Sequence, residues 1–279
     1  VSCHFIGDLL YEKPYYDWIE DDSQDKGYYD LVRPYLQNDD LSIANLETPI
    51  GGKELNISGT GYSFNASREI GKQVASLDLE VVSTANNHAN DRGNQGIDNT
   101  LDFLKEKDIL AVGTYYNQDD RDQGKYMTIH GIKFGFVSYT YATNQIVSDE
   151  NQAKVALFNR PSDRKMTQAY KDLLTKEVTQ TRENCDVLIA MMHWGNEFTY
   201  DISTQQEEVS QLLSDLGVDI IIGNHSHCSQ PMEWINNNRT LCMYSLGNFV
   251  SADPIVDRTH QEFKNAYNVS MMVSLDIVE

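Results

Sequence analysis

Residues of the types that bind metal ions stand directly after five apolar segments of the sequence. In an α/β sheet the carboxyl ends of the strands meet at one edge, and ligands bind there. If the five segments are strands, their ends bring carboxylate, amide and imidazole donors into one crevice. One strand that ends in His or Asp would mean little, whereas five such strands predict a site. The candidate ligands are Asp8, Glu47, Asn87, His193, His225 and His227.

Oxygen and imidazole donors together suit borderline divalent ions such as zinc, manganese or iron. Carboxylates crowded together without a cation would repel one another unless they were protonated. A bound ion would polarise an ester or amide and lower the pKa of a water molecule toward about 7. His88 follows the ligand-type Asn87, so we expect it to protonate a leaving group rather than to bind metal.

Each candidate also has a plain structural interpretation. Asp8 and Glu47 could be ordinary turn or cap residues. A lone His193 would usually be structural, but Trp194–Glu197 beside it indicates a shaped loop. The run Asn86–Asp91 is harder to explain by structure alone, because polar residues after an apolar strand need many hydrogen-bond partners when they are buried.

His225 and His227 are the strongest pair of candidates. Alternate residues of an extended chain lie on the same side, so the two imidazoles could hold one ion or two neighbouring ions. His4 shares a strand with Asp8 but lies roughly 13 Å from it, at ~3.3 Å per residue, and we expect it to stay outside the site. The histidines that we expect to be structural are His4, His130 and His260.

Strand-like and helix-like segments alternate along most of the chain, which predicts an α/β layered fold. The near-continuous hydrophobicity of the strands suits sheets that are covered on both faces. His130–Gly131 and Asn236–Asn238 are typical of hairpin turns, and Asn268–Val278 is expected to be a closing strand. The other expected strands are His4–Gly7, Leu41–Asn45, Glu80–Thr84, Lys133–Tyr139, Asp186–Met192 and Val218–Gly223.

Four apolar stripes at helical spacing predict helices that cover these strands. Ser67 is expected to cap the first, Pro161–Asp163 to open the third, and Ser203 or Thr204 to begin the fourth, which Gly217 ends. Loops are expected at Trp18–Lys26, Gly51–Gly61 and Thr143–Gln152. Because the sequence contains no repeat and no proline-rich linker, we expect one domain over residues 1–279. The apolar stripes are Ile70, Val74 and Leu77; Ile97, Leu101 and Leu104; Met166, Tyr170, Leu174 and Val178; and Val209, Leu212, Leu213 and Leu216.

The sequence is strongly acidic, with 22 Lys and Arg against 42 Asp and Glu among 279 residues and a formal net charge of −20. Such a surface repels phosphate backbones, so we expect no nucleic-acid partner. It would also repel a polyanionic product unless a cation cluster or bound metal reversed the sign locally. No apolar run approaches the ~20 residues of a membrane-spanning helix.

The four cysteines show no C-x-x-C spacing, and we expect isolated thiols because a chain of this size does not need disulfides. The first residue is Val1 rather than Met, and Val1–Ile6 already has the pattern of a strand. We therefore expect a leader, anchor or tag to precede this sequence.

Six ordered motifs, which span nearly the whole chain, resemble those of the CapA family of bacterial capsule synthesis proteins tied to poly-gamma-glutamate. That family in turn resembles the calcineurin-like metallophosphoesterases. The resemblance implies a four-layer α/β/β/α sandwich with mixed sheets and one or two divalent ions at the sheet edge. The motifs are Gly7–Leu10, Asn45–Ile50, Ala85–Asp91, His193–Glu197, Gly223–His227 and Tyr244–Phe249.

The resemblance also implies a role for each candidate residue. Asp8 and His227 would hold a first ion, and Glu47 would bridge it to a second. Asn87, His193 and His225 would hold that second ion. His88 would act as general acid, supported by Asp91, and the residues expected to orient imidazoles are Asp91, Glu197 and Asn248.

Two positions depart from the pattern of the wider superfamily. Leu10 stands where a histidine is expected, and Glu47 stands where the bridging residue is usually Asp. The first ion position is therefore short of a ligand, which makes a single-metal site an alternative.

The leading hypothesis is a metal-dependent hydrolase that acts on a phosphoester or amide bond of an envelope polymer or of a phosphorylated small substrate. It would work at the extracellular face of a bacterial membrane, held by an N-terminal anchor. One alternative is a non-catalytic, metal-containing component of a membrane complex that polymerises or exports poly-gamma-glutamate. A weaker alternative is a binding protein for a small phosphorylated ligand.

Overall fold

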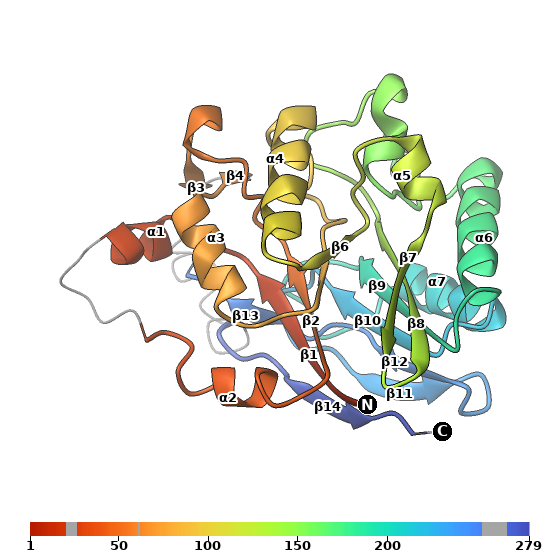
Figure 1. Ribbon diagram of the computed structural model, residues 1–279. Coiled ribbons are helices and arrows are strands. Elements are labelled where there is room, and N and C mark those ends of the chain that lie inside the picture. The colour runs from red at the N-terminus through yellow and green to blue at the C-terminus, as the bar shows by residue number, and fades with distance from the viewer. Residues whose placement is uncertain (21–26, 61, 253–266, 279) are drawn as a thin grey trace.

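The computed structural model describes residues 1–20, 27–60, 62–252 and 267–278 (Figure 1). Within these residues, a first six-stranded sheet has the order β13-β1-β2-β5-β6, and β14 pairs with the first half of β1, on the edge that faces away from β2. All neighbours in it are parallel except β14, which runs antiparallel to β1. Its strands are β1 (Ser2–Leu9), β2 (Leu41–Leu46), β5 (Val81–Ser83), β6 (Leu110–Val112), β13 (Asn248–Val250) and β14 (Val273–Asp276).

A second six-stranded sheet, again within the described residues, has the order β11-β12-β10-β9-β8-β7. The four inner strands are parallel, and the edge strands β7 and β11 are antiparallel to their neighbours. Both sheets are therefore mixed, as predicted. The strands are β7 (Lys125–Ile129), β8 (Ile132–Thr140), β9 (Val187–His193), β10 (Ile220–Asn224), β11 (Met232–Ile235) and β12 (Thr240–Met243).

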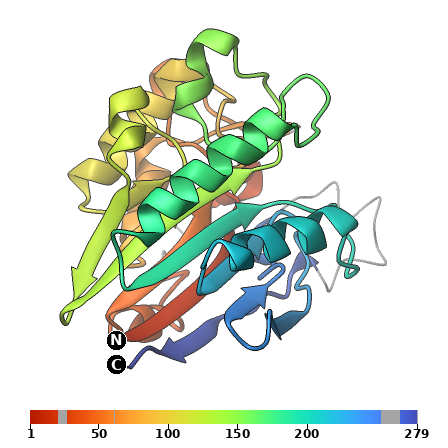
Figure 2. The same cartoon turned by 90° about the vertical axis from the view of Figure 1, so that its right-hand side faces the viewer.

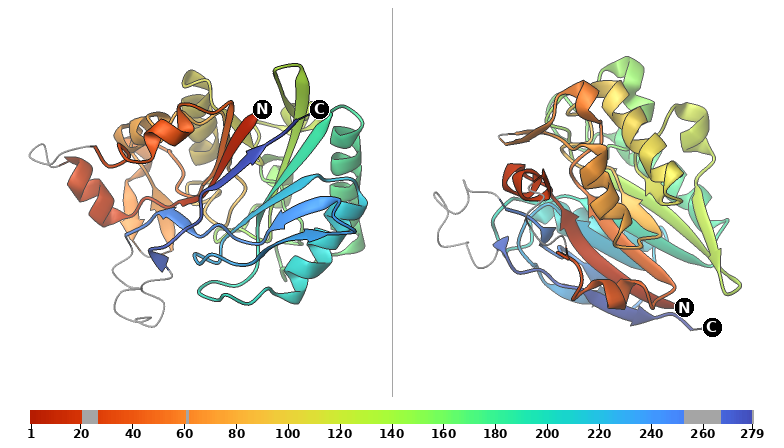
Figure 3. Two further views of the ribbon diagram at one scale, coloured as in Figure 1. Left: turned by 90° about the horizontal axis from the view of Figure 1, so that it is seen from below. Right: turned by 60° about the vertical axis from the view of Figure 1, so that its left-hand side comes forward.

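Helices cover the outer face of each sheet. The helices α6 (Gln168–Arg182) and α7 (Thr204–Asp215) lie on the second sheet, as Figure 2 shows. On the first sheet lie α1 (Lys13–Glu20), α2 (Arg33–Leu36), α3 (Arg68–Ala75) and α4 (Gly93–Glu106) (Figure 3). The shorter elements are α5 (Gln118–Asp122), the 3-10 helices η1 (Lys53–Leu55) and η2 (Asp149–Lys154), and a hairpin of β3 (Ser58–Thr60) and β4 (Ser63–Asn65).

Alternate residues of each strand face two different cores. Ile43 of β2 and Val81 of β5 pack between the sheets, where they meet Ile189 of β9 and others from the second sheet. The next residues, Ala44 and Val82, pack under the helices. Near-continuous hydrophobicity is what such doubly covered strands require. The four-layer α/β/β/α sandwich implied by the family resemblance is confirmed.

The helix signals of the sequence are confirmed where a cap is present. The Ser67 side chain accepts a hydrogen bond from Ile70 N at the start of α3. Ser203 and Gln206 form a capping box at the start of α7, and Gly217 follows α7 with a φ of 90°. All four cysteines are free thiols, as expected.

Some boundaries were predicted wrongly. Pro161–Asp163 does not open a helix, because α6 begins only at Gln168 after Thr167. Trp18 and the residues after it up to 20 belong to α1 rather than to a loop, and residues 21–26 lie outside the described residues. The expected loops at Gly51–Gly61 and Thr143–Gln152 contain η1, β3 and the start of η2. Among the described residues, no helix is both long and apolar enough to cross a membrane.

Candidate metal centre

The carboxyl ends of strands from both sheets meet at one end of the molecule. Asp8 pairs with Asn45 where β1 and β2 lie side by side. In the other sheet, His193 at the end of β9 pairs with Asn224 at the end of β10. The two ends face each other across the layer between the sheets, so side chains far apart in the sequence converge there, as predicted.

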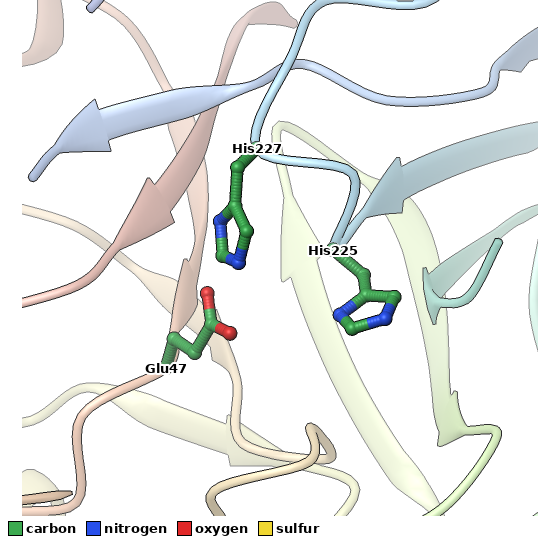
Figure 4. Close-up of side chains that lie close together, drawn as sticks. All are labelled: Glu47, His225 and His227. Atoms are coloured by element: carbon green, nitrogen blue, oxygen red, sulfur yellow. The ribbon is translucent and has the colours of Figure 1, made fainter. Parts of the chain in front are cut away.

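Glu47 lies at the centre of this convergence and is fully buried. One of its carboxylate oxygens and one nitrogen each of His225 and His227 all lie within 4.8 Å of one another. A carboxylate oxygen of Glu47 forms a second such group with a carboxylate oxygen of Asp8 and a nitrogen of His193. Figure 4 shows the carboxylate directed toward the rings of His225 and His227. Among the described residues, neither Glu47 oxygen has a hydrogen-bond donor. Burial raises the pKa of Glu47 well above its usual value, and the nearby charge of Asp8 adds to the effect.

Asp8 is also fully buried, but its carboxylate has donors. Asn45 Nδ2 donates to Oδ1 at 2.7 Å, and the backbone N–H of His225 donates to Oδ2 at 3.3 Å. His227 Nδ1 lies 3.6 Å from Oδ2. Burial raises the pKa of Asp8, while the charge of His227 and the two hydrogen bonds oppose that rise.

His193 and His225 lie side by side, with ring centres 4.6 Å apart. His193 Nε2 is 2.9 Å from Asn87 Oδ1 and 3.5 Å from Glu47 Oε1. His225 Nδ1 has no hydrogen-bond partner among the described residues. Burial, followed by neighbouring histidines, lowers the pKa of both rings well below the usual 6.5. Neutral imidazoles are the form that binds metal ions.

His225 and His227 are positioned by a turn rather than by an extended strand, which corrects the geometry expected from their spacing. Their φ angles are 93° and 56°, in the left-handed region that residues with a side chain rarely adopt. Such strained backbone is found at functional sites when the surrounding structure holds it in place. His227 Nδ1 lies 2.8 Å from Asn248 Oδ1, and its Nε2 lies 4.0 Å from Glu197 Oε1.

His88 and Asp91 form a separate pair beside these residues. His88 Nδ1 lies 2.7 Å from Asp91 Oδ2, which also accepts a hydrogen bond from Phe64 N at 2.6 Å. The Phe64 ring stands edge-on to the His88 ring at 4.5 Å. His88 N donates to Asn86 Oδ1 at 3.1 Å. A buried carboxylate therefore holds the imidazole through its Nδ1 atom. His88 belongs to neither group of close donor atoms around Glu47.

Asn45 is a site residue that the sequence reasoning did not assign. It donates to Asp8 Oδ1, and its Nδ2 lies 3.4 Å from His193 Nδ1, so it orients both candidate ligands. The signal was present, because Asn45 lies two residues before Glu47, near the end of β2. The histidines that were expected to be structural lie elsewhere where they are described. His4 bonds to Asp39, His130 lies beside Asp40, and His260 lies outside the described residues.

The fold resembles that of several solved structures. A protein from Thermus thermophilus that is described as hypothetical is 15% identical with a TM-score of 0.54, and the alignment covers 99% of this chain and 88% of that one. A structure described as a novel phosphatase from Mycoplasma pneumoniae is 14% identical with a TM-score of 0.53, covering 89% and 72% of the two chains. At these identities the likeness concerns the fold alone.

Relatives are also recognised by sequence, and two of them are CapA proteins. The PGA biosynthesis protein CapA of Bacillus subtilis is 26% identical over 255 residues, which are 90% of this chain and 63% of that protein. The capsule biosynthesis protein CapA of Bacillus anthracis is 29% identical, covering 78% of this chain and 52% of that protein. This chain therefore spans between about half and two thirds of their length. Residues 2–253 match the family described as bacterial capsule synthesis protein PGA_cap, and the chain belongs to that family.

Proposed function

We propose that this chain is a metal-dependent hydrolase-like domain of poly-gamma-glutamate capsule biosynthesis, acting on a phosphoester or amide bond at the cell surface. The observation that carries the proposal is the Glu47 carboxylate, which is fully buried, has no hydrogen-bond donor among the described residues and is surrounded by imidazoles. A buried carboxylate in that state is costly unless it is protonated or faces a cation. The surrounding donors are of the types that bind a divalent ion.

The proposed ligands fit one or two ions of zinc, manganese or iron. Both groups of close donor atoms contain Glu47, so its carboxylate would be a ligand together with either group. When bound, an ion would polarise the scissile bond and acidify a water molecule. The proposed ligands are Asp8, Glu47, Asn87, His193, His225 and His227.

His88 would supply the proton to the leaving group. Asp91 holds Nδ1 of the ring, so Nε2 is the atom that can release a proton toward a substrate. Asp91 fixes the orientation of the ring without contacting the substrate itself. Asn86 supports the same arrangement from the backbone side.

Placement at the extracellular face through an N-terminal anchor, and work beside a capsule-synthesis complex, are part of this proposal. They are supported by the two CapA relatives, whose names place them in capsule and PGA biosynthesis. A second candidate function is a non-catalytic component of a polymerisation or export complex. A Mycobacterium tuberculosis relative, 24% identical over 70% of this chain and 51% of that protein, favours it through its description as a probable polyglutamine synthesis accessory protein.

The deciding experiment combines metal analysis with a panel of phosphomonoester, phosphodiester and γ-glutamyl substrates. The purified protein should hold a stoichiometric divalent ion and turn over at least one class of substrate. Retained metal with no turnover, together with saturable binding of poly-gamma-glutamate, would favour the non-catalytic function. Binding of phosphate alone, without turnover, would favour a phosphorylated-ligand binding protein.

Glu47→Gln tests the role of Glu47 in metal binding while leaving the rest of the fold intact. The variant keeps the side-chain shape but removes the buried charge, so it should lose metal and turnover while the metal-free form unfolds at an equal or higher temperature than the metal-free parent. Metal addition should raise the melting temperature of the parent only. Equal metal content in both proteins would contradict the proposed role of Glu47.

A further inference from the structure

A tight turn between residues 160 and 165 carries an arginine toward the candidate metal centre. Arg160 N donates to Lys165 O and Arg164 N donates to Arg160 O, both at 2.9 Å. The Arg160 guanidinium also pairs with Asp163 across the turn. These contacts hold Arg164 in the left-handed region, with a φ of 55°. The backbone from which the Arg164 side chain extends is therefore fixed at several points.

The Arg164 guanidinium lies against a wall of the metal centre. Its Cζ is 5.6 Å from the ring centre of Tyr141, and that ring centre is 4.7 Å from the ring centre of His225. Tyr141 N donates to His193 O at 3.0 Å, which attaches the tyrosine to the strand that carries a candidate ligand. A guanidinium held over an aromatic face keeps its N–H edge available for a carboxylate or phosphate.

Arg164 lacks the carboxylate partner that five other arginines have among the described residues. In the described part of the chain, its guanidinium makes neither an ion pair nor a hydrogen bond. Arg92, which also lies near the site, donates instead to Leu55 O, Asp91 O and the Ser63 hydroxyl. The arginines that pair with a carboxylate are Arg33, Arg68, Arg121, Arg160 and Arg182.

Acidic groups lie around the site, and Arg164 supplies a positive charge among them. Glu47 and Asp8 are buried in the centre, Glu197 lies beside His227, and the whole chain has a net charge of −20. An anionic substrate would be repelled unless a positive group received its charge. Each amide nitrogen within a γ-glutamyl chain is bonded to a carbon that also bears a free α-carboxylate, so such a polymer presents an anion beside every scissile bond.

We propose that Arg164 is the specificity-determining residue that binds a substrate oxyanion, a carboxylate or a phosphate, next to the bond cleaved at the metal centre. The position of that bond rests on the proposed function, whereas the binding of the anion does not require turnover. The guanidinium would donate two parallel hydrogen bonds to the oxyanion while Tyr141 supports its flat face.

Isothermal titration of the metal-loaded protein tests this directly with three probes. They are a γ-glutamyl oligomer with free α-carboxylates, the same oligomer with its α-carboxyl groups amidated, and inorganic phosphate. Arg164→Gln should weaken binding of the oligomer, of phosphate, or of both by about tenfold or more, because a charge-assisted bidentate contact is lost. Lys165→Gln, which removes the same charge one residue away, should bind within about twofold of the parent, because an exposed charge without ligand contact is screened.

The pattern of losses identifies the anion. A loss confined to the oligomer that bears free carboxylates supports a carboxylate, and a loss confined to phosphate supports a phosphate. Arg164→Lys should recover only part of the affinity, since an ammonium group cannot donate the paired bonds. Equal affinities for the parent and Arg164→Gln, equal losses in Arg164→Gln and Lys165→Gln, or a parent that binds none of the probes would overturn the inference.

Metal content and unfolding temperature, measured on the same samples, keep the two proposals apart. Arg164→Gln should hold as much metal as the parent, since Arg164 is not a proposed ligand. A parent that binds the oligomer through Arg164 but holds no metal, or cleaves nothing, would fail the proposed function and leave this inference standing.

Discussion

At the scale of single residues, the most informative contact is the one between His88 and Asp91. The carboxylate of Asp91 accepts hydrogen bonds from both His88 and the backbone N–H of Phe64. The second bond holds the carboxylate in place, so that it can orient the imidazole. Because Nδ1 is engaged, the ring has a defined tautomer and a defined direction for proton release. Such pre-positioning is what general acid catalysis requires.

We expect His88→Ala to lower kcat by about 10²–10⁴-fold on a substrate whose leaving group must be protonated. The loss should be smaller on a p-nitrophenyl ester, whose leaving group departs without a proton. Metal content should stay at the parent value, and His130→Ala, at an exposed position beside Asp40, should behave as the parent. An unchanged kcat on the poor leaving group would show that His88 is not the acid.

The sequence located the candidate ligands because strand ends are visible as an abrupt change from apolar to polar residues. It did not reveal how His225 and His227 reach Glu47, since their backbone conformation depends on close packing of neighbouring segments. Gly223 illustrates this, because a Cβ there would stand only 2.0 Å from Tyr244 O. The position of Arg164 could not be predicted for a similar reason, because only the folded turn brings its side chain to Tyr141.

At the scale of secondary-structure elements, Glu80 ties the start of β5 to the start of β2. Its Oε2 accepts a hydrogen bond from Ser42 N at 2.6 Å, and its backbone oxygen accepts one from Leu110 N at 2.9 Å. Burial raises the pKa of Glu80 to about 7, with the nearby charge of Asp39 adding to the rise and the Ser42 hydrogen bond opposing it. Three strands of the first sheet therefore meet at a group that titrates near neutral pH.

The raised pKa of Glu80 makes the folded state less stable as the pH rises. The folded chain binds the Glu80 proton more tightly than the unfolded chain does, so the stabilisation is complete below the unfolded pKa and is lost as pH rises through about 7. Between about pH 4.5 and 8, the parent should lose about 1–2 kcal/mol relative to Glu80→Gln, which cannot ionise. Urea denaturation at several pH values measures this difference.

A matched control is Glu208→Gln, at an exposed position on α7. It should follow the parent at every pH, because an exposed glutamate contributes little to folding. Parallel pH profiles for the parent and Glu80→Gln would contradict the expected role of Glu80.

The element boundaries show which signals are local and which are not. Ser67 and Ser203 act through hydrogen bonds to residues three positions away, so their caps could be predicted from the sequence alone. Pro161–Asp163 has the composition of a helix start but forms the turn closed by Arg160 and Lys165. That bridge competes with helix formation, and it becomes apparent only when the partner residue is known.

At the scale of the whole molecule, β14 completes the first sheet from beyond the part that matches the family. The match ends at residue 253, whereas β14 spans Val273–Asp276 and pairs along β1 from Ser2 to Phe5. Val273 and Leu275 pack against the core between the two sheets. The strand that carries Asp8 is therefore protected along this edge by a segment outside the matched region.

Deleting residues 268–279 should lower the free energy of unfolding by about 2–5 kcal/mol, since it removes a strand ladder and the partly buried side chains of Met271, Val273, Leu275 and Ile277. It should also promote association, because the edge of β1 becomes available to other chains. A chain that ends at Ile277 keeps β14 and serves as the control. Identical chemical denaturation curves for the parent and the longer deletion would contradict this role of β14.

The two ends of the described chain lie together, with Val1 N donating to Ile277 O at 2.8 Å (Figure 1). Asp8 lies seven residues after Val1, roughly 23 Å away at ~3.3 Å per residue. A tether or label attached at either end would thus lie far from the candidate metal centre. A short linker joining both ends could close the polypeptide into a ring without reaching the candidate metal centre.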